Sequence, residues 1–153
     1  MQTATDVIRL LRGKTLATAE SCTGGMIGQV LTDVPGASQV YKGGVISYCN
    51  EVKADLLNVP VEMLEKYGAV SAPVAAAMAE GAAKVLSADV AVSTTGLAGP
   101  SGDEYGNPVG RVYIGYHDKK GTVTREFTFS GDREAVRRQA VEAALKLILE
   151  HNR

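Results

Sequence analysis

The chain has 153 residues, of which 16 are Lys or Arg and 17 are Asp or Glu, so its formal net charge is -1. Nucleic-acid-binding domains usually carry a basic excess, and this balance argues against one. No apolar run approaches the roughly 20 residues that cross a bilayer, and the N-terminal segment lacks the apolar centre of a signal peptide. We expect one domain over residues 1–153, located in the cytoplasm.

The few cysteines and histidines narrow the chemistry. Cys22 and Cys49 form no metal-ligand spacing, and a cytosolic chain of this size needs no disulfide. His117 precedes a turn and His151 lies near the C-terminus, so neither falls beside a glycine-rich junction. We therefore expect neither a metal nor a cofactor, and a base other than histidine if the protein is a hydrolase.

Helical patterns alternate with short apolar runs along the chain, before a late hairpin. The predicted helices are 5–13, 24–34, 50–59, 61–68, 71–87 and 131–152. The predicted strands are 14–20, 43–49, 88–96, 111–118 and 122–130. The residues expected to cap helices are Thr5, Asn50, Ser71 and Asp132. This order predicts an α/β fold, a single three-layer α/β/α domain with a mixed, mostly parallel sheet.

The turn after the first strand is the first candidate site. A buried strand ends in Ser21-Cys22-Thr23 and opens into Gly24-Gly25 at the start of a helix. The first N–H groups of a helix have no partner within it, so the backbone donors from Cys22 to Gly25 can hold an oxyanion or a phosphate. Ser21 would then be a nucleophile, although the segment is not the G-x-S-x-G signature. The alternative is that Ser21 or Thr23 is only a helix cap.

The end of the second strand carries a second candidate site. Tyr48 closes that strand, and Lys53 falls in the first turn of the next helix if Asn50 is its cap. The field of a helix N-terminus disfavours a cation, and partial burial lowers the pKa of a lysine further. Such a lysine can act as a base, directly or through a tyrosine. The alternative is a solvated lysine beside a tyrosine at the sheet edge.

A glycine-rich loop over 96–110, with five glycines in fifteen residues, follows the third strand. Long loops in compact domains are usually binding loops, and strand ends in α/β sheets border the ligand crevice. Thr95, Gly96 and Gly99 are therefore candidates to contact a ribose or a phosphate. The loop matches neither the G-x-x-x-x-G-K-[ST] nor the G-x-G-x-x-G motif, which argues against ordinary nucleoside triphosphate or dinucleotide binding.

The last helix opens with three arginines after its predicted cap. Arg133, Arg137 and Arg138 can each reach a phosphate of a ligand bound at this edge of the sheet. Arg133 and Arg137 are the candidates for substrate binding. Solvated helix arginines are the alternative.

Six motifs occur along nearly the whole chain: AESCTGG, GGVISYCNEVKADLLNV, YGAVSAPVAAAMAEGA, TTGLAGPSG, PVGRVYIG and GDREAVRRQAVEAAL. Together they resemble the CinA C-terminal domain family, the nicotinamide-nucleotide amidohydrolases. The resemblance implies hydrolysis of the carboxamide of nicotinamide mononucleotide to nicotinic acid mononucleotide and ammonia, as in pyridine nucleotide salvage. It places the family's serine, tyrosine and lysine on Ser21, Tyr48 and Lys53.

The resemblance and the residues suggest one mechanism. Lys53, neutral and acting with Tyr48, takes the Ser21 proton as the oxygen attacks the amide carbonyl.

The loop GPSGDEYGNPVG belongs to the variable part of the family, so ligand contacts beyond Gly99 are not assigned. Some members carry an additional N-terminal nucleotide-pyrophosphatase domain, and this sequence starts about where the C-terminal domain would.

Three other hypotheses stay open. In the first, Cys22 or Cys49 is the nucleophile and Glu20 is its base. In the second, the protein is a noncatalytic nucleotide-binding module. In the third, it is a structural partner domain, such as one supporting DNA uptake, against which the near-neutral charge argues. We expect a nucleotide as the small-molecule partner, no nucleic acid or membrane, and a homo-oligomer such as a dimer.

Overall fold

Five strands form one mixed sheet in the order β2–β1–β3–β4–β5 in the computed structural model, which describes residues 1–153. The strands are β1 (Leu16–Glu20), β2 (Tyr41–Ile46), β3 (Val90–Gly96), β4 (Arg111–Asp118) and β5 (Gly121–Thr128). β1 pairs in parallel with both β2 and β3, whereas β3, β4 and β5 pair antiparallel. A parallel centre thus continues into the predicted hairpin, and the expected mixed α/β sheet is confirmed.

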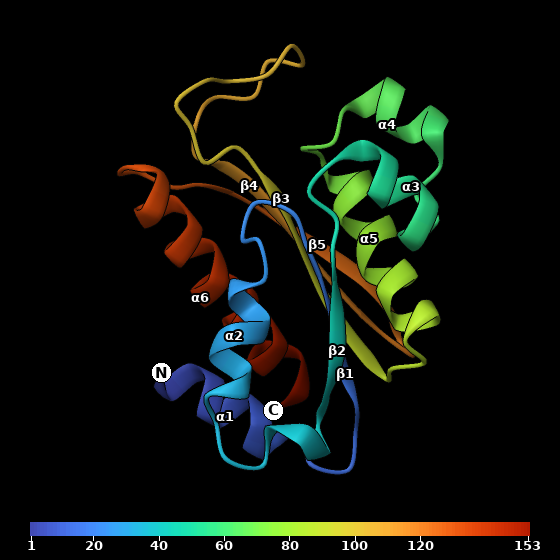
Figure 1. Cartoon of the computed structure of the whole chain (residues 1–153), viewed down its shortest axis with the longest axis vertical. Helices are drawn as coiled ribbons and strands as arrows, with labels where there is room; N and C mark the ends of the chain where they lie inside the picture. Colours follow the sequence, from blue (N-terminus) through green and yellow to red (C-terminus); the bar gives the residue numbers. More distant parts are fainter.

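Two helical layers cover the sheet (Figure 1). The helices are α1 (Gln2–Leu10), α2 (Met26–Thr32), α3 (Asn50–Leu57), α4 (Val61–Tyr67), α5 (Ala72–Val85) and α6 (Arg133–Asn152), with a short 3-10 helix at Ala37–Gln39. α1, α2 and α6 lie on one face, and α3, α4 and α5 lie on the other. The three-layer α/β/α arrangement predicted from the sequence is therefore present.

The central strands are buried on both faces, which explains their continuous apolar character. All residues of β1 are buried, and its side chains alternate between the two cores. Leu16 joins the larger core, with α1, α2 and α6, whereas Ala17 and Ala19 join the smaller one, with α5. In β3 the same alternation puts Val92 in the larger core and Ala91 in the smaller one.

Two of the four predicted helix caps are confirmed. The Ser71 hydroxyl accepts from the Val74 N–H at 3.4 Å, and the Asp132 carboxylate accepts from the Ala135 N–H at 2.9 Å. The Thr5 prediction is wrong, because α1 begins at Gln2 and buries Ala4 completely, which places Thr5 inside the helix. The Asn50 prediction is also wrong, because Asn50 is the first residue of α3 and the N-cap is Cys49, which makes no side-chain capping bond.

The topology brings three chain segments to one edge of the sheet. The carboxyl ends of β1, β2 and β3 lie at the top of the view in Figure 1, where β1 leads into α2 and β2 leads into α3. The loop from β3 to β4 lies at the same edge. None of the helices is both long and apolar enough to cross a membrane.

Candidate functional site

The turn from β1 into α2 is tight and depends on two glycines. The Ser21 N–H continues the sheet by donating to Thr94 O at 3.0 Å, and the Gly24 N–H then donates back to Ser21 O at 3.1 Å. Gly24 and Gly25 have φ values of 57° and 101°, in the left-handed region that favours glycine. The chain therefore reverses immediately after Ser21.

Glu20 occupies the N-terminal end of α2. Its carboxylate accepts the Thr23 hydroxyl at 2.6 Å and the N–H groups of Gly25, Ile27 and Gly28 at 2.9–3.2 Å. The side chain is buried, and its charge lies against the positive end of a helix, where an anion is stabilised. This carboxylate, rather than a ligand, therefore fills the anion position that the sequence predicts at the start of the helix.

Some backbone N–H groups of the turn between β1 and α2 are hydrogen-bonded within the chain, and others remain free to bind a ligand. The N–H groups of Gly24 and Gly25 are bonded within the chain, to Ser21 O and to Glu20. The N–H groups of Cys22 and Thr23 have no acceptor. The residue that caps α2 is Gly25, without a side-chain bond, so the Ser21 hydroxyl does not serve as a helix cap.

Lys53 reaches Ser21 across the edge of the sheet. Its Nζ lies 3.1 Å from Ser21 Oγ and donates to Ser47 O at 2.8 Å. The lysine is 1% exposed, and this burial lowers its pKa to about 8. The predicted direction of the shift is therefore correct, but burial under the β2–α3 connection is its main cause.

Tyr48 lies near this pair without touching it. β2 ends at Ile46, so Tyr48 falls in the connection to α3 and is 60% exposed. Its hydroxyl accepts from an Arg133 NH2 group at 2.8 Å and is hydrogen-bonded to neither Ser21 nor Lys53. The structure therefore joins two of the three predicted catalytic residues directly and places the third beside them.

A cavity of about 260 Å³ opens over these residues. Its lining residues are Ser21, Cys22, Tyr48, Asn50, Lys53, Ala69, Val70, Thr95, Gly96, Leu97, Ala98, Gly99, Ser101 and Arg133. Eight of the twelve predicted site residues are among them, and the four that are not are Thr23, Gly24, Gly25 and Arg137. Sequence reasoning missed the wall formed by Ala69 and Val70, although the YGAVSAP motif contains both.

Arg137 supports the turn from behind. Its Nε donates to Cys22 O at 3.0 Å and its NH2 to Thr23 O at 3.1 Å. The C=O of Cys22 and the N–H of Thr23 belong to one planar trans peptide and point in opposite directions. By holding the carbonyl on the side of α6, Arg137 fixes the direction of the free Thr23 N–H.

The two cysteines have different surroundings. Cys22 is 4% exposed, and burial raises the pKa of its thiol to about 11, so the thiol is protonated at neutral pH. Glu20, the base considered for a cysteine nucleophile, is engaged by the donors of α2 and by Thr23. Cys49 is exposed. These contacts argue against the Cys22–Glu20 alternative.

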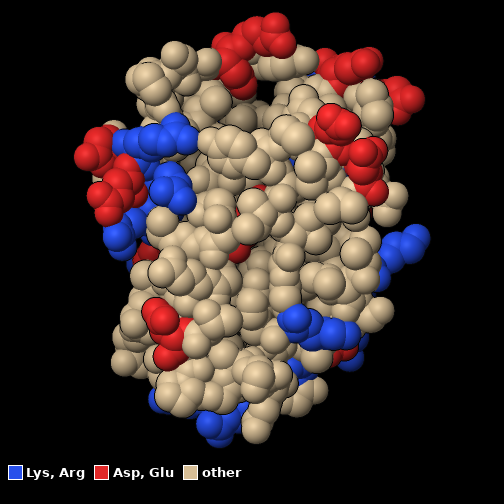
Figure 2. All heavy atoms as spheres, viewed as in Figure 1, with Lys and Arg blue, Asp and Glu red and all other residues tan.

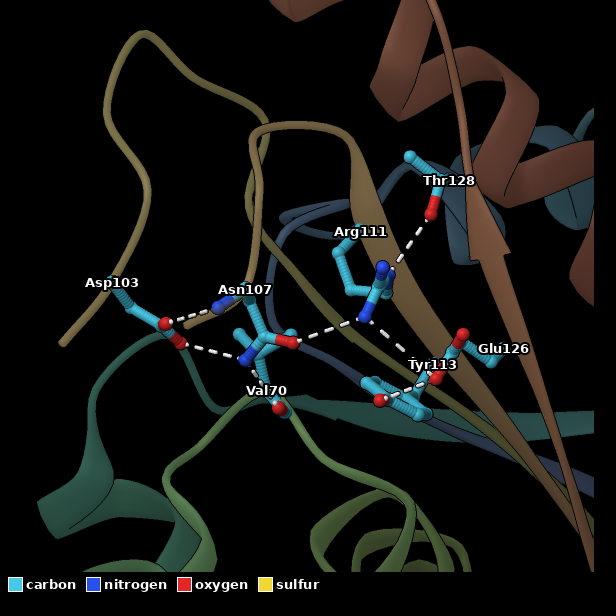
Figure 3. A network of polar contacts seen from close by, with 7 residues as sticks. All are labelled: Val70, Asp103, Asn107, Arg111, Tyr113, Glu126 and Thr128. Atoms are coloured by element: carbon cyan, nitrogen blue, oxygen red, sulfur yellow. Dashed lines mark hydrogen bonds and ion pairs between the residues drawn. The ribbon is translucent and has the colours of Figure 1, made fainter. Parts of the chain in front are cut away.

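The loop between β3 and β4 is anchored to neighbouring segments by a network of polar contacts (Figure 3). Asp103 accepts from the backbone and side-chain N–H groups of Asn107, both at 2.9 Å, and the Asn107 amide also donates to Val70 O at 2.9 Å. Arg111, at the start of β4, donates to Thr128 of β5 at 2.9 Å. Tyr105 adds a bond from its hydroxyl to Glu65 O in α4. These contacts hold the loop against α4, the α4–α5 connection and the hairpin.

No group of three or more His, Cys, Asp or Glu side chains lies close enough together to hold a metal ion. The polar groups that face the cavity are hydroxyls, amides, backbone groups and two cations. The arrangement offers a nucleophile beside a lysine of lowered pKa, and unpaired N–H groups next to that nucleophile. These are the elements of acyl transfer.

Comparisons with known proteins agree with this geometry. The family model described as the CinA C-terminal domain matches residues 1–151. The chain is 48% identical over 138 residues to the nicotinamide-nucleotide amidohydrolase PncC of Escherichia coli, which covers 90% of this chain and 84% of that protein. It is also 48% identical over 137 residues to a CinA-like protein of Desulfotalea psychrophila, covering 90% of this chain but 33% of that protein.

Solved structures share the fold. The competence/damage inducible protein CihA of Agrobacterium tumefaciens matches with a TM-score of 0.95 and 36% identity over 99% of this chain and 94% of that chain. A CinA superfamily protein of Escherichia coli matches with a TM-score of 0.95 and 36% identity over 97% of this chain and 88% of that chain.

Proposed function

This chain belongs to the CinA C-terminal domain family, and on that basis we propose that it hydrolyses the carboxamide of nicotinamide mononucleotide to nicotinic acid mononucleotide and ammonia. The observation that carries the proposal is the 3.1 Å contact between Lys53 Nζ and Ser21 Oγ inside the cavity. The naming of a relative at 48% identity as a nicotinamide-nucleotide amidohydrolase supports this choice of amide.

Lys53 is the base in the proposed mechanism. With a pKa of about 8, about a tenth of the lysine is neutral at pH 7, against roughly 0.03% at its ordinary pKa of 10.5. The neutral amine accepts the Ser21 proton while Oγ forms a bond to the amide carbon. The resulting tetrahedral oxyanion is stabilised by the free N–H groups of Cys22 and Thr23.

The second half of the reaction returns the proton. The ammonium of Lys53, with Tyr48 at the cavity wall, protonates the amide nitrogen as the C–N bond breaks and ammonia leaves. Water then attacks the acyl-Ser21 ester while Lys53 accepts its proton. Lys53 returns this proton to Ser21 Oγ as the ester C–O bond breaks, and the acid product ionises to its carboxylate in solvent.

The remaining cavity residues bind the rest of the substrate. Thr95, Gly96 and Gly99 line the wall opposite α3 and are our candidates for the ribose. The Thr95 hydroxyl donates to Ala69 O at 2.7 Å, which leaves its lone pairs free to accept from a ribose hydroxyl. Arg137 acts on the turn that holds Ser21 rather than on the ligand.

We also propose that the protein acts in pyridine nucleotide salvage, in the cytoplasm and as a homo-oligomer such as a dimer. A groove lined by Phe127, Phe129 and several charged side chains lies between β5, an edge strand, and α6. A second copy would cover it. Light scattering coupled to size exclusion measures the subunit count and would contradict this part of the proposal by finding a monomer.

Ammonia release from nicotinamide mononucleotide tests the reaction. We expect the wild type to release ammonia, with or without a chelator, and Ser21→Ala to release none. Cys22→Ala is the matched control, because it alters the neighbouring cavity residue and leaves the proposed nucleophile in place. A wild type that binds the nucleotide without releasing ammonia over a range of pH would support the noncatalytic binding module instead.

A further inference from the structure

We infer that Arg133 recognises the phosphate group and thereby makes the enzyme selective for the mononucleotide over the nucleoside, an inference that rests on the proposed amidase function. Two cations line the cavity, Lys53 and Arg133, and no Asp or Glu side chain does. Lys53 is buried against Ser21, whereas Arg133 is exposed to solvent. The cavity therefore has one positive charge at its reactive end and another at its rim.

The guanidinium of Arg133 spans two walls of the cavity. It donates to Gly99 O in the β3–β4 loop and to the Tyr48 hydroxyl in the β2–α3 connection. Both acceptors are uncharged, and Arg133 forms no ion pair. A guanidinium carries five N–H donors, so these two bonds leave donors for a ligand.

The carboxylates beside Arg133 in the sequence are engaged elsewhere. Asp132 caps α6 through the Ala135 N–H, and Glu134 pairs with Arg138 at 2.9 Å. The charge of Arg133 is therefore not neutralised by its neighbours. An unpaired guanidinium at the rim of a cavity without carboxylates is suited to a dianion, because its planar fork can donate two parallel bonds to phosphate oxygens.

The other arginines of α6 are not available for this role. Arg137 uses Nε and NH2 on the carbonyls of Cys22 and Thr23 and does not line the cavity. Arg138 is paired with Glu134 and also lies outside the cavity lining. Figure 2 shows basic and acidic side chains together over the start of α6, while only acidic side chains gather over α3, α4 and the tip of the β3–β4 loop. The α6 side is thus the one side of the cavity that offers cations to an anion.

The chemistry of the substrate agrees with this placement. In nicotinamide mononucleotide the reacting carboxamide and the phosphate lie at opposite ends, joined through the ribose. With the carboxamide at Ser21, the phosphate is the part that extends to the rim. The cavity of about 260 Å³ is slightly smaller than the roughly 300–1,000 Å³ usual for ligand pockets, so a ligand whose ring end fills it would leave its phosphate at the rim beside Arg133.

Kinetics with two substrates that share the same amide test the inference. We would measure kcat/KM for nicotinamide mononucleotide and for nicotinamide riboside, which lacks the phosphate, in the wild type, in Arg133→Gln and in the control Arg138→Gln. Arg133→Gln is expected to lower kcat/KM for the mononucleotide by about 10- to 100-fold, the usual range for losing hydrogen bonds to a charged group, and to lower that for the riboside by a much smaller factor, because the variant also loses the bond to Tyr48. Arg138→Gln changes neither. Inorganic phosphate is expected to inhibit the wild type competitively and Arg133→Gln much less.

Two results would overturn the inference. An equal loss of kcat/KM for both substrates would mean that Arg133 acts by positioning Tyr48 and the Gly99 loop. Values of kcat/KM that stay at the wild-type level for both substrates would mean that Arg133 does not contact the phosphate. If the wild type releases ammonia from neither substrate, the amidase proposal fails. Calorimetric binding of the mononucleotide and the riboside to the wild type and to Arg133→Gln then still decides whether Arg133 recognises the phosphate.

Discussion

Replacing Lys53 by Met is expected to abolish activity and, at neutral pH, to stabilise the fold. The buried ammonium is disfavoured in the folded state, as its pKa of about 8 shows against 10.5 for a free lysine. At pH 7 this difference corresponds to about 3 kcal/mol of lost stability. Met has a similar length and no charge. The substitution removes the hydrogen bonds from Lys53 Nζ to Ser47 O and Ser21 Oγ. Each loss costs about 1 kcal/mol and offsets part of the gain in stability.

The lowered pKa of Lys53 also determines how the stability of the wild type changes with pH. Between pH 8 and 10.5 the unfolded chain binds more protons at Lys53 than the folded chain does, so wild-type stability rises with pH in that window. The penalty from Lys53 falls from about 3 kcal/mol at pH 7 to about 1 kcal/mol at pH 9.5. The wild type should therefore gain about 2 kcal/mol relative to Lys53→Met over this range, because other titrating groups cancel in the comparison.

Urea unfolding of both proteins at several pH values measures the difference directly. Lys53→Met should be about 1 kcal/mol more stable than the wild type at pH 7 and about 1 kcal/mol less stable at pH 9.5, so the two free energies of unfolding should cross between these pH values. The kcat/KM of the wild type should rise through an apparent pKa near 8. Parallel stability profiles would refute the reasoning, because they would mean that Lys53 has the same pKa in the folded and unfolded chains.

The remaining predictions concern the turn that holds Ser21. Glu20→Ala should destabilise the protein by about 3 kcal/mol or more in urea unfolding, because it leaves the buried donors of α2 without an acceptor, whereas Glu62→Ala on exposed α4 should change stability little. Arg137→Lys should lower kcat by about 10-fold or more with little change in KM, since it loosens the peptide of the free Thr23 N–H; a rise in KM alone would contradict this role. Cys22→Ala should retain most of the wild-type kcat, and an inactive, folded Cys22→Ala beside an active Ser21→Ala would reverse the assignment of the nucleophile.

The α/β fold could be predicted because its signals are local. Continuous apolar strands, glycine turns and the caps Ser71 and Asp132 each follow from a few neighbouring residues. The same locality explains the errors at helix starts. Thr5 is a residue type typical of a cap, but α1 begins before it and buries Ala4 in the core. This burial depends on the packing of α1 against α6 and α2, which the residues around Thr5 do not reveal.

The site could be predicted only in part, for a related physical reason. Ser21 was identifiable because it directly follows a strand, and Lys53 because it falls in the first turn of the helix after the neighbouring strand; strand ends of parallel pairs meet at one edge. The role of Arg137 was not identifiable in the same way. From the sequence it is one of three similar arginines on an amphipathic helix, and only the contact between α6 and the turn after Ser21 separates it from Arg133.

Glu20 and Lys53 are both buried, but the protein surrounds their polar groups differently, and this difference explains why one has a structural role and the other a proposed catalytic role. The carboxylate of Glu20 accepts four hydrogen bonds and lies at a helix N-terminus, so its ionised form is well solvated by the protein. The ammonium of Lys53 has two uncharged partners and no carboxylate, so burial destabilises its ionised form. The carboxylate of Glu20, with all these bonds, fixes the turn. The ammonium of Lys53, which has few partners, loses its proton near a pH of about 8, and Lys53 is the residue that contacts the hydroxyl of Ser21.

A carboxylate placed near Lys53, for example by Ala69→Asp at the cavity wall, should therefore raise the pKa of Lys53. Activity should then fall strongly at pH 7 and less at high pH. A uniform loss of activity at every pH would argue that Lys53 does not act as the base.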